Sequence, residues 1–222
     1  GSLFMWKKFF KKGSGIYGID LNPEALSLKK YGFNITIGDQ SKKSFWRSFY
    51  KKNKKFDVII DDGGHTNIQQ ITTLMESVNN VNDGGKIIFE DTHTSFMKKK
   101  GFNNPSKYSL YSFANKIVES IHRRNPNLKK NMNLLSKIIY SIEFYDSIII
   151  FNIDRKKCVP SKNLENNISL RKLFTDYRFK KEKKSNYETD IPSFIDKNFS
   201  KRSPLFKFFE NRNIIKYLKN LD

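Results

Sequence analysis

FDVIIDDGGH at residues 56–65 and KIIFEDTHTS at residues 86–95 are the two stretches that decide the fold. In each stretch a short apolar strand is followed by a pair of acidic residues. Between them, apolar residues from Ile71 to Val78 recur at helical spacing, which predicts an amphipathic helix. A strand, a helix and a second strand in this order predict two neighbouring parallel strands.

The same alternation extends to both sides of these stretches. Ile16–Asp20 and Asn34–Ile37 read as further strands, and each is followed by a helical pattern. Ile142–Tyr145 and Ser147–Ile153 are joined too tightly to be parallel, so they predict an antiparallel hairpin. The predicted fold class is α/β, a doubly wound, mostly parallel sheet that ends in an antiparallel hairpin.

The alternation also sets the predicted domain organisation. Residues 1–153 are assigned to this domain, and we expect its first strand to be lacking because Leu3–Trp6 reads as the start of an apolar helix. Residues 154–222 form a basic extension, in which Leu205–Leu218 indicates one amphipathic helix. That helix is expected to pack on the domain or on a partner subunit; the alternative is a helix at a membrane surface.

Composition restricts the class of protein. The chain has 222 residues and a formal net charge of +20, from 42 Lys and Arg against 22 Asp and Glu, and the basic residues are spread throughout. Such dispersed charge argues against dedicated nucleic-acid binding. No apolar run is long enough to span a membrane. One cysteine, Cys158, excludes an internal disulfide and a cysteine-based zinc site, and it favours the cytoplasm.

Acidic residues follow four of the predicted strands. In parallel α/β sheets, ligands bind beyond the carboxyl ends of the strands. Asp20 is at the position where nucleoside-binding folds place an acid that accepts hydrogen bonds from ribose hydroxyls. Asp39, after the next strand, is placed to accept a hydrogen bond from an adenine amine. The alternative for either residue is a structural role in a turn or a helix cap.

The acidic pairs at 61–62 and 90–91 predict a metal site. Two adjacent carboxylates repel each other unless a cation lies nearby, and strands that pair in parallel lie ~4.8 Å apart. Oxygen ligands favour Mg²⁺, Mn²⁺ or Ca²⁺ over zinc. His65 follows Asp62 by three residues, within reach of a ligand held by the metal. The alternative is that some of these acids only cap helices.

These motifs resemble the macrocin-O-methyltransferase family, which consists of class I S-adenosylmethionine-dependent enzymes that methylate sugar hydroxyls with the help of Mg²⁺. The resemblance is carried by 56–65 and 88–95, with further matches at Tyr17–Asp20, Gly38–Gln40 and Phe144–Ser147. The opening Gly1-Ser2-Leu3 looks like the end of the family's glycine-rich motif. The similarity covers about residues 1–153.

The resemblance implies a role for each matching residue. It implies Asp62, Glu90 and Asp91 as metal ligands and His65 as the general base. It also implies that S-adenosylmethionine is bound by Gly1, Ser2, Asp20, Asp39 and Asp61, and for Asp61 the alternative is a supporting role behind the metal ligands.

The predicted function is therefore an S-adenosylmethionine- and Mg²⁺-dependent O-methyltransferase that acts on a sugar hydroxyl of a glycan or glycosylated metabolite. Two alternatives remain open. One is a methyltransferase for a phosphate-like or nucleotide-linked acceptor, which the basic charge would favour. The other is a non-catalytic, basic RNA-binding protein on the same scaffold. The sequence also leaves a homo-oligomer open.

Overall fold

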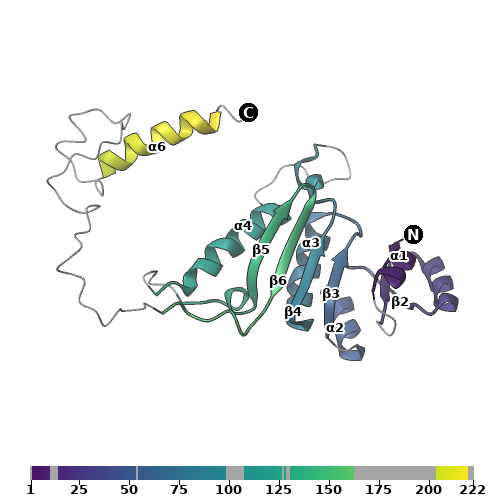
Figure 1. Ribbon diagram of the computed structural model, residues 1–222. Coiled ribbons are helices and arrows are strands. Elements are labelled where there is room, and N and C mark those ends of the chain that lie inside the picture. The colour runs from purple at the N-terminus through teal and green to yellow at the C-terminus, as the bar shows by residue number, and fades with distance from the viewer. Residues whose placement is uncertain are drawn as a thin grey trace. The chain divides into compact units, whose positions relative to one another are not determined.

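The computed structural model describes residues 2–10, 15–53, 55–98, 108–126, 128, 131–162 and 204–219 (Figure 1). The chain divides into two compact units, Gly1–Leu164 and Glu165–Asp222. The first unit contains all the strands that the described residues form. The functional division at residue 153 stays a prediction.

A four-stranded sheet carries both acidic motifs. Its strands are β3 (Phe56–Asp61), β4 (Val81–Phe89), β5 (Ile139–Tyr145) and β6 (Ile148–Ile153), in the spatial order β3-β4-β6-β5. β3 and β4 pair in parallel, whereas β6 is antiparallel to both of its neighbours. The predicted parallel pair and the closing antiparallel hairpin are therefore confirmed.

Two helices cover one face of this sheet. α3 (Asn67–Ser77) and α4 (Leu110–Ile121) lie on the same side, behind the strands in Figure 1. Between them and the strands lies the hydrophobic core, in which the largest fully buried side chains include Phe89, Phe151 and Leu74. Strand residues that point to the opposite face, such as Ile88 and Ile150, are only half-buried. The period of two along each strand thus separates a core face from a more open face.

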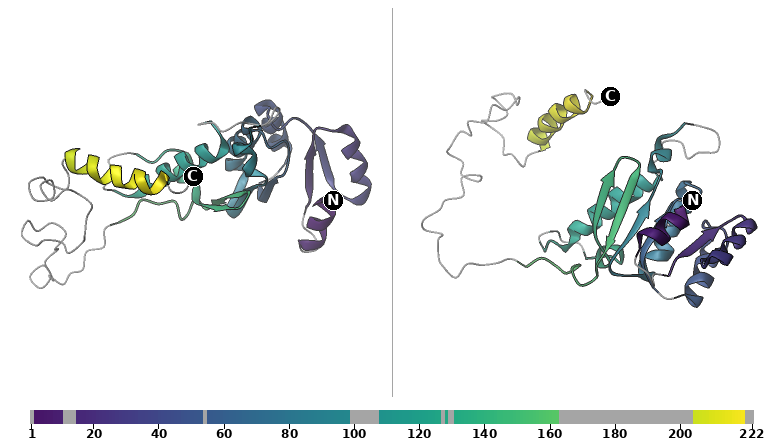
Figure 2. Two further views of the ribbon diagram at one scale, coloured as in Figure 1. Left: turned by 90° about the horizontal axis from the view of Figure 1, so that it is seen from above. Right: turned by 45° about the vertical axis from the view of Figure 1, so that its right-hand side comes forward.

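The described strands form two sheets, whereas the predicted fold class has one. β1 (Tyr17–Asp20) and β2 (Asn34–Ile37) pair in parallel with each other but share no strand with the larger sheet (Figure 2). Among the described residues, β1 and β3 each keep one edge without a strand partner. The 3₁₀ helix η1 (Pro23–Tyr31) packs against β2, and α1 (Ser2–Phe9) precedes these two strands in the chain. α2 (Lys43–Lys52) instead contacts the larger sheet's elements, because Phe49 stacks on Phe56 of β3 and the Tyr50 hydroxyl donates to Ser77 of α3.

The remaining helices are short, with one exception. Single 3₁₀ turns form at η2 (Val78–Asn80), η4 (His122–Arg124) and η5 (Leu135–Lys137), and η3 (Thr92–Phe96) follows the second acidic motif. In the second unit, α6 (Pro204–Lys219) occupies the segment where a helix was predicted. Within the described residues, no helix is long and apolar enough to cross a membrane.

Two adjacent glycines in β4 allow a test of the β3–β4 pairing. A methyl group on Gly85 would lie 2.5 Å from the backbone oxygen of Asp57, whereas one on Gly84 would meet no atom within 4 Å. Gly84 instead has a left-handed φ of 85°. We expect Gly85→Ala to lower the free energy of unfolding by about 3 kcal/mol, because it forces the strands apart. Gly84→Ala should cost only about 1 kcal/mol of backbone strain.

Urea denaturation of both variants measures this difference. Gly84→Asn is the control, because asparagine adopts the left-handed conformation more readily than alanine does, and it should be more stable than Gly84→Ala. Equal losses for the two alanine variants would contradict the close approach at Gly85.

Candidate active site

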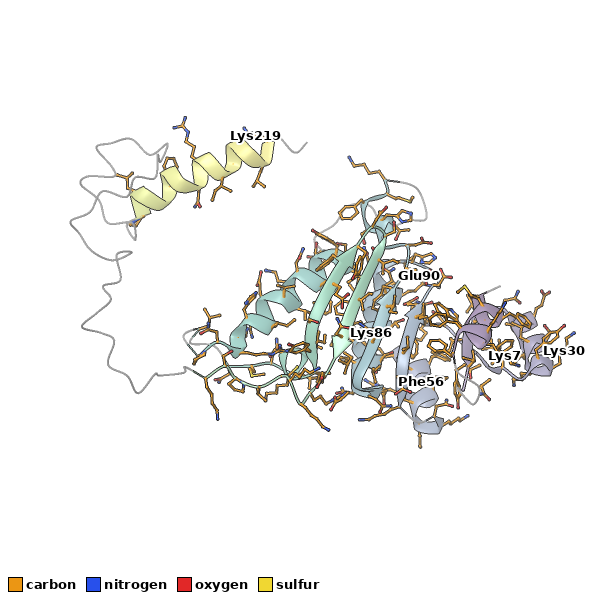
Figure 3. All side chains as sticks on the ribbon, viewed as in Figure 1. Lys7, Lys30, Phe56, Lys86, Glu90 and Lys219 are labelled. Atoms are coloured by element: carbon orange, nitrogen blue, oxygen red, sulfur yellow. The ribbon has the colours of Figure 1, made fainter. Side chains whose placement is uncertain are left out.

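The parallel register of β3 and β4 brings the two acidic motifs together. Asp61 pairs with Phe89, and the backbone N–H of Glu90 donates to the Asp61 carbonyl oxygen over 3.0 Å. The residues that follow these pairs, Asp62 and Glu90, therefore leave the sheet side by side. Figure 3 shows Glu90 near the end of the sheet where these loops begin, with Lys86 farther back along β4.

Asp62, His65 and Asp91 form a compact group of possible metal ligands. One donor atom from each residue lies within 4.8 Å of the other two, and His65 Nε2 is 3.5 Å from Asp91 Oδ2. Burial raises the pKa of Glu90, and repulsion from the Asp62 and Asp91 carboxylates raises it further. The site thus concentrates negative charge, and its carboxylate and imidazole donors fit a divalent cation.

The backbone is strained at two members of this group. His65 and Asp91 have left-handed φ values of 54° and 52°, which residues other than glycine rarely adopt. A single side chain joins the two positions: the buried Thr94 hydroxyl lies 3.1 Å from the His65 carbonyl oxygen and 2.8 Å from that of Asp91. Strain of this kind persists only where neighbouring contacts enforce it, and it is common at functional sites.

Asp61 has a different environment from Asp62. Its side chain is 6% exposed, and both carboxylate oxygens lie 3.0 Å from Gln40 Nε2. The backbone N–H of Gly63 also donates to this carboxylate. Burial raises the pKa of Asp61, and these hydrogen bonds lower it in part. Asp61 therefore anchors the loop that carries Asp62 and His65.

Gln40 was not predicted to have this role. Its amide donates to Asp61, and its side-chain oxygen lies 3.4 Å from the Gly64 nitrogen. Gln40 therefore ties the segment after β2 to the loop after β3. Gln70 on α3 is a second such residue, because its amide nitrogen lies 3.4 Å from the Glu90 carbonyl oxygen. The Gly-Asp-Gln motif was the only sequence signal for Gln40, and Gln70 had none.

Asp20 is the last residue of β1, and Asp39 follows the end of β2 by two residues. Asp20 is exposed, and one of its oxygens accepts a hydrogen bond from the Asn22 nitrogen over 2.8 Å. Asp39 accepts one from the Ser41 nitrogen over 2.8 Å, and hydrogen bonding by Ser41 lowers the pKa of Asp39. These turn contacts leave carboxylate oxygens for a ligand, so the roles of both residues stay predictions. Ser2 is exposed at the start of α1, and Gly1 lies outside the described residues.

Curated proteins similar to this chain are named as O-methyltransferases, and the name of one of them specifies a rhamnosyl compound. Demethylmacrocin O-methyltransferase from Streptomyces fradiae is 31% identical over 122 residues, which cover 54% of this chain and 30% of that protein. The 8-demethyl-8-α-L-rhamnosyl tetracenomycin-C 2'-O-methyltransferase of Streptomyces olivaceus is 27% identical over 123 residues, which cover 55% and 32%. No family model matches the chain.

A solved structure confirms the fold class. It is the MycE methyltransferase from the mycinamycin biosynthetic pathway, in complex with Mg, SAH and mycinamycin VI. The alignment has a TM-score of 0.63 at 23% sequence identity and covers 69% of this chain and 40% of that one. The chain spans about a third of the length of the curated relatives it matches. Over the aligned residues of this chain, the resemblance predicted from the two acidic motifs is confirmed.

The strain at His65 predicts an unusual order of stability. We expect His65→Gly to be more stable than His65→Ala by about 1 kcal/mol, because glycine adopts the left-handed conformation without a steric penalty. His93 is the matched control, since its φ is not left-handed and it lies in η3. There the order should reverse, with glycine less stable than alanine by about 0.5–1 kcal/mol. Thermal and urea unfolding of the four variants measure both differences; the same order at both positions would contradict strain at His65.

Proposed function

We propose that the chain is the catalytic part of an S-adenosylmethionine- and Mg²⁺-dependent O-methyltransferase that acts on a sugar hydroxyl. The observation that carries the proposal is the convergence of Asp62, His65 and Asp91 beyond paired parallel strands. The relatives named above are O-methyltransferases, and the rhamnosyl compound in the name of one of them supports the choice of acceptor. A cytoplasmic enzyme is inferred from the single cysteine, and the acceptor is taken to be a small molecule or a glycan.

In this proposal three carboxylates hold the metal, those of Asp62, Glu90 and Asp91, and His65 of the compact group is not used as a ligand. The negative charges of these carboxylates repel one another, and a bound cation would relieve that repulsion. When bound, Mg²⁺ provides positive charge that lowers the pKa of a neighbouring hydroxyl. The strained loops fix the positions of His65 and Asp91 before any ligand arrives, which reduces the ordering required on binding.

His65 is assigned to proton transfer. An alcohol is a weak nucleophile at neutral pH, so a base must accept its proton as the methyl group is transferred. The imidazole of His65 lies beside Asp91, and glycines at 63 and 64 keep the preceding loop free of bulky side chains. Asp20 and Asp39 are assigned to the ribose and adenine of the methyl donor, which carries its own electrophilic methyl group.

The metal assignment predicts a chelator-sensitive enzyme. We expect EDTA to abolish methyl transfer by the complete protein and excess Mg²⁺ to restore it. Asp62→Asn should raise the Mg²⁺ concentration needed for half-maximal rate by at least about tenfold, since it removes one charged ligand. Asp57→Asn, an exposed acid earlier on β3, is the matched control and should leave the Mg²⁺ requirement unchanged. Full activity in excess EDTA would refute the metal site.

If His65 is the general base, its removal should slow methyl transfer, and added Mg²⁺ should not restore the rate. We expect His65→Ala to lower kcat by about 10² to 10⁴, because a general base contributes that much. The alternative is that His65 only orients Asp91, which lies 3.5 Å from it; in that case the variant would bind Mg²⁺ more weakly.

Measuring kcat across a Mg²⁺ titration separates the two roles. His93→Ala is the control, because His93 Nδ1 is 3.9 Å from the same carboxylate yet is not assigned a proton-transfer role. Recovery of the His65→Ala rate at high Mg²⁺ would refute the general-base assignment.

A further inference from the structure

Three exposed aromatic side chains form a continuous surface beside the candidate active site. Phe96, Tyr111 and Phe144, here called the aromatic surface, come from η3, α4 and β5. The rings of Phe96 and Tyr111 are 5.4 Å apart between centroids, and those of Tyr111 and Phe144 are 5.7 Å apart. Their exposed fractions are 57%, 41% and 41%. Aromatic rings in contact with each other yet open to solvent often mark a binding site.

The register of the sheet places this surface at the same end as the acids. Phe144 pairs with Ile149, which in turn pairs with Phe89, the residue immediately before Glu90. Phe144 is thus two strands away from Phe89, a distance of about 10 Å at the usual strand spacing. Phe96 is five residues after Asp91 along a 3₁₀ helix, again about 10 Å away.

The turn between β5 and β6 is hydrogen-bonded to the residues that follow Asp91. The Ser147 carbonyl oxygen accepts a hydrogen bond from the Thr92 nitrogen over 3.0 Å, and the Ser147 hydroxyl lies 3.0 Å from His93 Nδ1. Thr92 directly follows Asp91. The turn after Phe144 and the loop that carries Asp91 therefore form one hydrogen-bonded structure, so the aromatic surface is held at a fixed position relative to the acids.

We propose that the aromatic surface binds a pyranose ring of the methyl acceptor while the reacting hydroxyl lies at the acids. This inference rests on the proposed function. A pyranose has a face rich in C–H groups and a rim of hydroxyls, so it packs against aromatic rings and still reaches polar groups. The three side chains carry no charge, which fits a neutral sugar better than a phosphorylated ligand. A distance of about 10 Å between the surface and the acids favours an acceptor larger than one sugar ring.

Saturation-transfer NMR on the complete protein tests this binding directly. The probes are methyl glycosides of glucose, galactose and rhamnose, each also tried as a disaccharide. We expect at least one probe to bind, and Phe144→Ala and Phe96→Ala to weaken that binding by about tenfold each. Tyr111→Phe should retain it. Tyr140→Ala is the matched control, because Tyr140 is 43% exposed at the other end of β5, and it should bind as the wild type does.

Separate measurements distinguish the other outcomes. Calorimetric binding of S-adenosylhomocysteine reports on the proposed function alone: its absence with pyranoside binding intact would refute the methyltransferase and leave the aromatic surface supported. Wild-type protein that binds no pyranoside, or variants that bind all probes unchanged, would overturn the inference. Light scattering that shows dissociation of an oligomer in Phe96→Ala would assign the surface to contact between copies and would also overturn it.

Discussion

The parallel register between β3 and β4 is the constraint on which the candidate site depends. Because Asp61 pairs with Phe89, the acids that follow must leave the sheet side by side. The carboxylates of Asp62 and Asp91 are close enough to raise the pKa of Glu90, in addition to the effect of burial. Like charges at such separations are unfavourable, and the buried apolar contacts of Ile87 and its neighbours hold the strands together against them. A cation bound between these carboxylates would neutralise part of their charge and so remove the unfavourable repulsion.

The sequence predicted those parts of the structure that follow from short-range pattern. Apolar runs that end in acids identified β3 and β4, and the tight connection at Asp146 identified the antiparallel hairpin. Because acids at the carboxyl ends of adjacent strands must converge, the sequence alone was enough to predict that Asp62 and Asp91 lie together. The division into two sheets was not predicted as such, since strand periodicity does not state which strands pair.

Contacts between loops could not be predicted in the same way. Gln40 is 21 residues from Asp61, and no periodicity links an amide to a distant carboxylate, yet this pair fixes the loop that carries His65. The left-handed backbone at His65 and Asp91 was equally invisible, because neither residue type requires it. Thr94 shows why the strain is tolerated: one buried hydroxyl lies within hydrogen-bond distance of both carbonyl groups, so it restrains the two loops together.

The two surfaces at this end of the sheet have complementary physical properties. The carboxylates of Asp62, Glu90 and Asp91 interact only with atoms a few ångströms away. By themselves they therefore do not distinguish one hydroxyl of a sugar from the next. The aromatic rings of Phe96, Tyr111 and Phe144 are uncharged and in contact with one another, so any ligand they bound would be held through area and shape. Hydrogen bonds between Ser147 and the residues just after Asp91 keep the two surfaces at a constant separation. A ring seated on the aromatic surface would therefore determine which hydroxyl reaches His65, because an orientation fixed at two separated points leaves little freedom at the reacting atom.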